Sequence, residues 1–231
     1  MSRLPLPVAL LLACALLLAA CGGDDKEKAA SETPAASATD TPEPAQEAGC
    51  EKVDKPAPRK PAKLPKPKDE LERGKTYVAR VLTNCGEFEI TLDPKRAPRT
   101  GGSFASLVAK RFYDNLTFHR IAAGFVIQGG DPKGDGTGGP GYSVTEKPPS
   151  DLTYSKGVVA MAKTGTEPAG TSGSQFFVVT GEAPDLPPDY ALLGKVTKGM
   201  DVVDKIGVLA VGPDEAPTQP VVIRQIRITE S

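Results

Sequence analysis

Residues 118–131 read Phe-His-Arg-Ile-Ala-Ala-Gly-Phe-Val-Ile-Gln-Gly-Gly-Asp, and this stretch places one cation, Arg120, beside apolar side chains. A guanidinium is always charged and offers five hydrogen-bond donors in a fixed fork. Phe125 and Val126 follow at short range and can wall an apolar pocket, while Gln128 adds an amide that both donates and accepts. Such a site suits a ligand that is apolar at its centre and polar along its backbone, such as a peptide containing proline.

A second informative stretch, residues 172–177, reads Ser-Gly-Ser-Gln-Phe-Phe. Residues 118–131 closely resemble one signature of the cyclophilins, which are peptidyl-prolyl cis–trans isomerases, and residues 172–177 resemble the other. The two stretches lie in the order and at roughly the separation that the family shows. The resemblance covers about residues 76–229, and it implies a prolyl isomerase that needs no metal and no other cofactor.

The part of the chain after residue 75 is expected to be mainly β. Residues 76–83 and 87–92 alternate polar and apolar side chains, as a hairpin with one solvated face does. Many short strands with two helices indicate a closed antiparallel barrel, and the resemblance implies an eight-stranded cyclophilin-like barrel capped by two helices. The further strands are expected at 116–121, 125–128, 157–162, 174–179, 190–196 and 221–228, and the helices at 100–111 and 199–206.

The resemblance also implies roles for individual residues. Catalysis is expected from Arg120, with Phe125 and Gln128 beside it. Lys163 stands where an Asn is common, and Asp185 stands where many cyclophilins have Trp, which predicts weak binding of the inhibitor cyclosporin. Substrate contacts are expected from Val126, Ala162, Lys163, Thr171, Gln175, Phe177, Leu186 and Tyr190.

Composition divides the chain unevenly. All five Tyr and all seven Phe lie at or after Tyr77, whereas residues 22–75 are rich in proline and charge and hold no aromatic side chain. Such a segment cannot bury enough apolar surface to offset its chain entropy. We therefore expect a disordered tether at 22–75 and one isomerase domain, a monomer, at 76–231. The second half of this tether, residues 51–75, is rich in Lys and Arg. It either contacts anionic envelope polymers or lipid headgroups, or serves as a solvated spacer.

The N-terminus has the pattern of a targeting segment. Arg3 precedes an apolar run at 8–20 that is too short to span a bilayer comfortably. The four residues that end at Cys21 resemble a bacterial lipoprotein processing site, at which the cysteine becomes the lipidated first residue. Residues 1–21 are thus expected to be a lipoprotein signal peptide, which would anchor the protein at the extracytoplasmic face of the cell membrane. The alternative is an ordinary secretory signal in which Cys21 occurs by chance.

Two of the four cysteines remain once the signal and the lipid site are set aside. Cys50 and Cys85 form an even pair in an oxidising compartment, so we expect a disulfide between them rather than two free thiols. A zinc site is not expected, because His119 is the only histidine and no Cys-x-x-Cys motif occurs.

Two other patterns favour structure over chemistry. Residues 134–139 satisfy the dinucleotide-binding pattern, but Pro140 follows, so no helix begins there to receive a phosphate. We interpret them as a glycine-rich surface loop. His119 is expected to be structural and not a member of a catalytic triad. The net charge of −1 gives no reason to expect a nucleic-acid partner.

Two functions therefore remain open on the sequence. The first is a prolyl isomerase that helps exported proteins fold, with X–Pro segments as its substrates. The second is a binding module that holds proline-containing segments in the same groove without useful turnover. A tethered solute-binding lipoprotein fits less well, since the domain is small and shows no two-lobed pattern.

Overall fold

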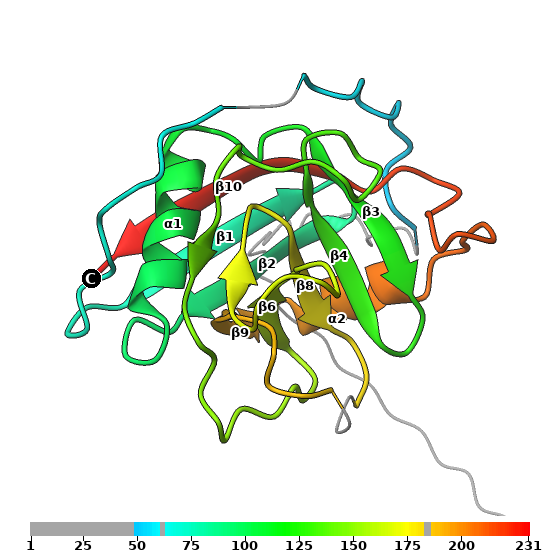
Figure 1. Cartoon of the computed structure of the whole chain (residues 1–231). Helices are drawn as coiled ribbons and strands as arrows, with labels where there is room; N and C mark the ends of the chain where they lie inside the picture. The colour runs from blue at the N-terminus through cyan, green and yellow to red at the C-terminus, as the bar shows by residue number, and fades with distance from the viewer. Residues whose placement is uncertain (1–48, 61–62, 183–185) are drawn as a thin grey trace, which may run out of the picture. The chain divides into compact units, whose positions relative to one another are not determined.

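The computed structural model describes residues 49–60, 63–182 and 186–231, and within these ranges eight strands close an antiparallel barrel (Figure 1). The strand order around the barrel is β1-β10-β3-β4-β8-β6-β9-β2. The expectation of a closed eight-stranded barrel with two helices is confirmed. The barrel strands are β1 (Tyr77–Thr83), β2 (Gly86–Leu92), β3 (Leu116–Ala122), β4 (Val126–Asp131), β6 (Val158–Met161), β8 (Phe176–Val179), β9 (Leu192–Lys198) and β10 (Val222–Glu230).

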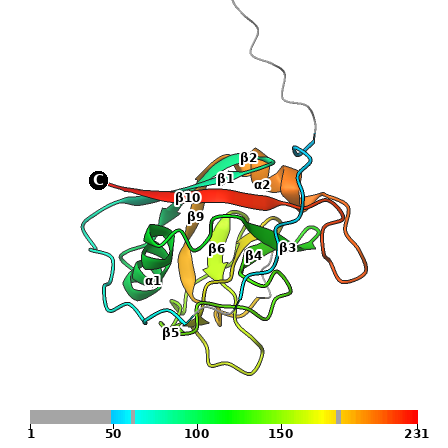
Figure 2. The same cartoon turned by 90° about the horizontal axis from the view of Figure 1, so that it is seen from above.

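Helices α1 (Pro98–Ala109) and α2 (Met200–Gly207) lie on opposite sides of the barrel in both views (Figures 1 and 2). Proline is well placed at the first turn of α1, because the amide it lacks would have no partner within the helix. Phe104 of α1 and Ile206 of α2 are fully buried in the barrel core. Each helix thus shields core side chains from water at its own side of the barrel.

A second, two-stranded sheet pairs β5 (Val144–Thr145) with β7 (Thr171–Ser172). This sheet was not predicted, because strands of two residues are too short to show an alternating pattern.

Strands β4 and β8 are buried on both faces, and this is what creates a second apolar cluster outside the barrel. Successive side chains of a strand point to opposite faces. Phe176 and Val178 therefore join the barrel core, whereas Phe177 and Val179 join the outer cluster. In β4, Ile127 belongs to the core and Val126 to the outer cluster. The outer cluster is the floor on which the site described below is built.

Residues 49–60 and 63–75, here called the strap, run along the outside of the barrel (Figure 1). The strap amides of Arg59 and Leu64 donate hydrogen bonds to the carbonyls of Pro132 (2.8 Å) and Pro140 (2.9 Å). This corrects the expected disordered tether over these residues. Composition shows that the strap has no core of its own, but it does not show that the barrel supplies partners for it. Residues 1–48, with the expected signal peptide and Cys21, lie outside the described residues.

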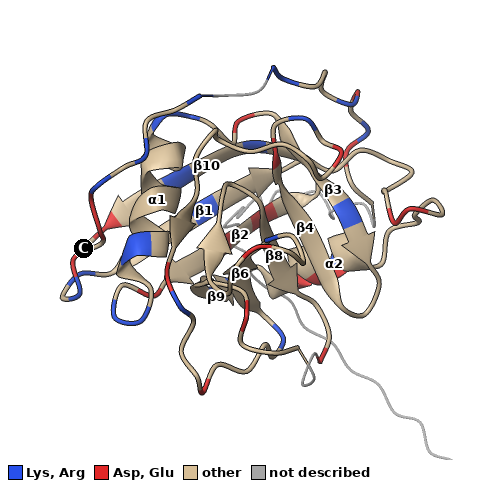
Figure 3. Cartoon of the chain, viewed as in Figure 1, with Lys and Arg blue, Asp and Glu red and all other residues tan. Residues whose placement is uncertain are grey.

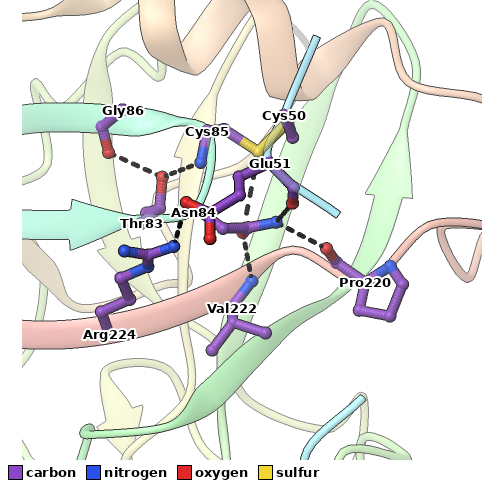
Figure 4. A network of polar contacts seen from close by, with 9 residues as sticks. All are labelled: Cys50, Glu51, Thr83, Asn84, Cys85, Gly86, Pro220, Val222 and Arg224. Carbon is purple, nitrogen blue, oxygen red and sulfur yellow. Dashed lines mark hydrogen bonds and ion pairs between the residues drawn. A yellow bond between two sulfur atoms is a disulfide. The ribbon is translucent and has the colours of Figure 1, made fainter. Parts of the chain in front are cut away.

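The expected disulfide between Cys50 and Cys85 is present and fixes the start of the strap to the turn between β1 and β2 (Figure 4). Lys205 of α2 donates a hydrogen bond of 2.9 Å to the carbonyl of Cys85, which ties the same turn to the helix.

Asn84, next to the disulfide, joins three segments at one point (Figure 4). Its Nδ2 donates to the carbonyls of Glu51 in the strap (2.7 Å) and Pro220 (3.1 Å), just before β10. Its Oδ1 accepts a hydrogen bond of 2.8 Å from the amide of Val222. The buried amide of Asn84 is thereby satisfied, and the chain before β10 is held to the strap.

Figure 3 shows Lys and Arg residues along the strap and around α1, with acidic residues among them. Arg99 of α1 pairs with Glu70 of the strap at 3.2 Å, and Lys75 pairs with Glu230 of β10 at 2.6 Å. Both pairs are exposed, and such pairs stabilise a fold by about 1 kcal/mol at most. The strap is thus held chiefly by its disulfide and its backbone hydrogen bonds. Among the described residues, none forms a helix with the length and apolar character needed to cross a bilayer.

Candidate active site

Strand register brings the main predicted residues into one row across the barrel wall. Arg120 of β3 lies opposite Gln128 of β4, and Gln128 lies opposite Phe177 of β8. Directly opposed residues in neighbouring strands are within side-chain reach of each other. Two stretches that are far apart in the sequence therefore meet at one place.

A cavity of about 210 Å³ opens above this row and above the outer apolar cluster. Each described residue that lines it belongs to the set predicted from the sequence. The lining consists of Arg120, Phe125, Val126, Gln128, Ala162, Lys163, Phe177, Leu186 and Tyr190.

The apolar wall of the cavity is held by aromatic packing. The rings of Phe177 and Tyr190 meet edge to face, with their centroids 5.4 Å apart, and Tyr154 lies behind both. The Tyr154 hydroxyl donates to the carbonyl of Tyr190 (2.7 Å) and accepts from its amide (3.0 Å). Burial raises the pKa of Tyr154 to about 12, so the hydroxyl keeps its proton. The shape of the wall is therefore held by contacts within the protein.

A chain of hydrogen bonds holds the polar side of the cavity. Arg120 donates from Nη1 to Oε1 of Gln128 (3.4 Å), and Gln128 donates from Nε2 to Oε1 of Gln175 (3.0 Å). Gln175 in turn donates from Nε2 to the carbonyls of Gly136 (2.9 Å) and Gly138 (3.0 Å). The amide groups of both glutamines are thus oriented, and the guanidinium is linked to the glycine-rich loop.

Glu215 is the residue of this site that the sequence did not reveal. Its carboxylate accepts a hydrogen bond of 2.6 Å from Nε of Arg120 and forms an ion pair with it. Glu215 lies in the connection between α2 and β10, outside both signature stretches, and no local pattern distinguishes it from other exposed acidic residues. Only the fold brings it to the arginine.

Lys163 lines the cavity but is already engaged by its neighbours. Its side chain is 5 % exposed, and Nζ donates to the carbonyl of Glu167 at 3.1 Å. The same nitrogen lies 3.6 Å from the carboxylate of Asp189 and 5.5 Å from the ring centroid of Tyr190. The charge therefore braces the cavity wall instead of pointing freely at a ligand.

The glycine-rich loop lines a neighbouring cavity of about 610 Å³, which shares Gln128, Ala162 and Lys163 with the first. The loop expected at 134–139 is present, and it approaches its surroundings closely. A Cβ atom at Gly138 would lie 2.0 Å from Oδ1 of Asp131, so a larger residue would displace the loop. The two cavities adjoin each other at Gln128, Ala162 and Lys163, and together they are called the groove.

Some expectations fall outside this groove. Thr171 is buried in β7 and lines neither cavity, so the structure does not bring it together with Arg120. Asp185 lies outside the described residues. A further cavity of about 640 Å³, bordered by basic and hydroxyl side chains near β2 and β9, contains none of the predicted site residues. Within the described ranges, no three His, Cys, Asp or Glu side chains gather as a metal site would require.

His119, next to Arg120 in β3, lies under the glycine-rich loop. Neither of its ring nitrogens has a hydrogen-bond partner among the described residues. Burial lowers the pKa of His119, while the carboxylate of Asp131 partly opposes that shift. A neutral, half-buried imidazole is consistent with the structural role expected from the sequence.

Comparisons with known proteins agree with this geometry. The family described as "Cyclophilin type peptidyl-prolyl cis-trans isomerase/CLD" matches residues 78–228. A probable peptidyl-prolyl cis-trans isomerase A of Mycobacterium leprae is 37% identical over 170 residues, which are 66% of this chain and 92% of the relative. Peptidyl-prolyl cis-trans isomerase B of Bacillus subtilis is 44% identical over 122 residues, or 52% of this chain and 83% of the relative.

A solved structure gives the same result for the fold. A cyclophilin-type isomerase of Cryptosporidium parvum, crystallised in the presence of the dipeptide Ala-Pro, superposes with a TM-score of 0.62 and 31% identity. The match covers 66% of this chain and 98% of that one. The match to the family spans both signature stretches, the closed barrel and the groove, and the chain therefore belongs to the cyclophilin-type peptidyl-prolyl cis–trans isomerases.

Proposed function

We propose that Arg120 is the catalytic group of this isomerase and that the 210 Å³ cavity holds the proline ring. The observation that carries the proposal is the position of the guanidinium: it donates a hydrogen bond to Gln128 and lies at the rim of an apolar cavity walled by Phe125 and Phe177. The Ala-Pro dipeptide named for the Cryptosporidium relative supports a proline-containing ligand.

The chemistry follows from the X–Pro bond itself. Rotation is slow because the C–N bond has partial double-bond character. As the bond twists, the nitrogen lone pair leaves conjugation with the carbonyl, and the nitrogen becomes able to accept a hydrogen bond. A donor fixed near that nitrogen binds the twisted state better than either planar state, which lowers the barrier. In this chain the available N–H groups of Arg120 supply the donor, while the cavity keeps the ring still.

The groove suits an extended peptide on either side of the proline. Gln128 and Gln175 present amide groups along it, and the second cavity extends it past Ala162. Polar groups spaced along an otherwise apolar groove can bind a peptide backbone while accepting varied side chains. We therefore propose proline-containing segments of unfolded proteins as substrates, bound by the isomerase as a monomer.

We further propose that the protein works at the extracytoplasmic face of the cell membrane, held there by a lipid on Cys21, and that exported proteins are its substrates. The disulfide between Cys50 and Cys85 supports this location, since such bonds persist in oxidising compartments. The apolar run at 8–20 and the residues before Cys21 support the anchor.

The catalytic proposal is tested by measuring cis-to-trans isomerisation of a proline peptide with the full chain in detergent. We expect acceleration of the peptide, and of the refolding of a protein limited by proline isomerisation. Peptide binding without acceleration would identify a holding module instead.

The location is tested by fractionating cells that make the chain with Cys21→Ala. We expect the variant to leave the membrane fraction or to stay unprocessed. The control is Cys14→Ala, which removes the other cysteine of the expected signal peptide and should behave as the wild type. Mass spectrometry of the mature N-terminus gives the second readout, and an unmodified terminus would reject the lipid anchor.

A further inference from the structure

We propose that Glu215 is a positioning residue for this isomerase, because its carboxylate fixes the orientation of the Arg120 guanidinium. The inference rests on the catalytic role proposed for Arg120. The contact is short, at 2.6 Å from Nε to Oε2, and it approaches the guanidinium from a different segment than the Gln128 contact does. Two anchors on two sides of a planar group restrict its rotation, which one anchor alone does not.

The backbone around Glu215 is built to hold this position. Its carbonyl accepts a hydrogen bond of 2.8 Å from the amide of Ile121, the residue after Arg120 in β3. Its own amide donates to the carbonyl of Gly212 at 3.1 Å, and Gly212 donates to Ala216 at 2.9 Å. Residue 215 is therefore docked on β3 by main-chain bonds that do not depend on its side chain.

The far end of the same connection is also fixed. Pro220 and Val222 are held by the side chain of Asn84, next to the disulfide (Figure 4). The connection between α2 and β10 is thus anchored both at its tip on β3 and at its return to the barrel. A carboxylate on such a segment has a defined place relative to Arg120.

The pairing of Arg120 with Glu215 leaves most of the guanidinium N–H donors available. A guanidinium has five N–H donors. Glu215 takes the one on Nε and Gln128 takes one on Nη1, so three remain on the two Nη atoms. The pairing therefore restrains the arginine and leaves donors for the prolyl nitrogen and the substrate backbone.

The backbone conformation of Glu215 also supports a positioning role. Its φ is +59°, in the left-handed region that a residue with a long side chain rarely adopts. A glycine or asparagine would fit this conformation with less strain. Strain that persists next to a reacting group supports a functional role for the residue that bears it.

The test compares Glu215→Ala, Glu215→Gln and a matched control, Asp214→Ala, in the isomerisation assay with the full chain in detergent. Asp214 is an exposed acid on the same turn, and its side chain makes no hydrogen bond or ion pair with another described residue. We expect Glu215→Ala to lower kcat/KM about tenfold, mainly through kcat, since the lost contact is charged but half exposed. Glu215→Gln, whose amide oxygen can still accept from Nε, should stay within about threefold of the wild type.

A double-mutant cycle separates positioning from a general effect on the fold. Once Arg120 is replaced by Ala, adding Glu215→Ala should change kcat/KM by less than about twofold. Equal losses in both backgrounds, or a loss in Asp214→Ala, would overturn the proposal. A rise in kcat/KM for Glu215→Ala would also overturn it and would show that the carboxylate competes with substrate for the arginine. Failure of the wild type to turn over peptide would reject the catalytic proposal itself, so the two failures are distinguishable.

Discussion

The strap and the β4–β8 wall are both held against the same barrel, but by different forces. The wall is apolar on both faces, so Phe176 and Phe177 are each buried, one in the core and one beneath the groove. The strap contributes few apolar side chains and is held by a disulfide, by Asn84 and by backbone hydrogen bonds. Composition can therefore predict which segment has a core of its own, but not which segment is ordered.

This difference predicts that the two regions control different properties. Changes in the strap should alter the free energy of unfolding and leave turnover of the folded protein nearly intact. Changes at Arg120 should lower turnover and leave the free energy of unfolding nearly unchanged, because its guanidinium lies at the rim of a cavity rather than in the core.

The largest effect is expected from removing the disulfide in the double variant Cys50→Ser, Cys85→Ser. The bond closes a loop with a sequence separation of 35 residues. In the chain-entropy account such a closure stabilises the fold by about 3 to 4 kcal/mol. Urea unfolding with and without reductant measures the loss, and the double variant should not respond to reductant. If the folded variant lost turnover as well, the strap would contribute to catalysis. The prediction that the strap affects only the free energy of unfolding would then be wrong.

Arg120→Ala should change turnover instead of stability. We expect kcat/KM to fall at least about a hundredfold, or roughly 2.7 kcal/mol, with an unchanged unfolding midpoint. Arg120→Lys should restore little, because an ammonium lacks the planar fork. Arg80→Ala, which removes an exposed guanidinium from β1, is the control and should leave kcat/KM unaltered. Full activity in folded Arg120→Ala would contradict the proposed mechanism.

A smaller effect tests the strap at a single hydrogen bond. Nη1 of Arg59 donates to the carbonyl of Phe112 at 2.8 Å. Arg59→Ala should lower the free energy of unfolding by about 1 kcal/mol, since one hydrogen bond to a charged donor is lost at a partly exposed position. The exposed neighbour Lys60 provides the control through Lys60→Ala. Equal unfolding curves for the two variants would show that the strap is not held at this point.

The smallest effect concerns pH and His119. Burial lowers the pKa of His119 from its ordinary 6.5, so the folded protein keeps the imidazole neutral where the unfolded chain would protonate it. The unfolded state then binds more protons, and stability falls as the pH falls below about 6.5. For one proton the slope cannot exceed about 1.4 kcal/mol per pH unit. The measurement is the free energy of unfolding between pH 7.5 and 5.5. In His119→Gln this free energy should fall less steeply with falling pH than in the wild type. An equal slope in both proteins would assign the pH dependence to other groups.

Much of the fold was predictable because its signals are local. The alternation at 76–83 and 87–92 and the apolar runs at 157–162 and 174–179 correspond to β1, β2, β6 and β8. The two-residue strands β5 and β7 were missed because no pattern fits in two residues. The order of the strap was missed because its hydrogen-bond partners, such as Pro132 and Pro140, lie far along the chain.

The site divides in a similar way. Arg120, Gln128 and Phe177 lie within the signature stretches, and the strand register places them side by side. Glu215 could not be found from the sequence, because its significance depends on the docking of one connection on β3. The engagement of Lys163 by Glu167 and Asp189 was equally hidden, since residue type alone does not tell whether a charge is free.

If a lipid on Cys21 anchors the protein as proposed, the cross-link between Cys50 and Cys85 has a mechanical consequence. If the chain is pulled from the membrane side, the load enters at Cys50 and passes through the sulfur bridge into the turn between β1 and β2. The part of the strap after Cys50 then lies outside the path of the load, and it stays bound to the barrel. The load is borne by the β1–β2 hairpin, whose β1 strand also pairs with β10, so the groove on β4 and β8 is spared the pull. Reduction of the bridge would pass the same tension into the strap and detach it first from Asn84, which binds Glu51, and only then from Pro132 and Pro140.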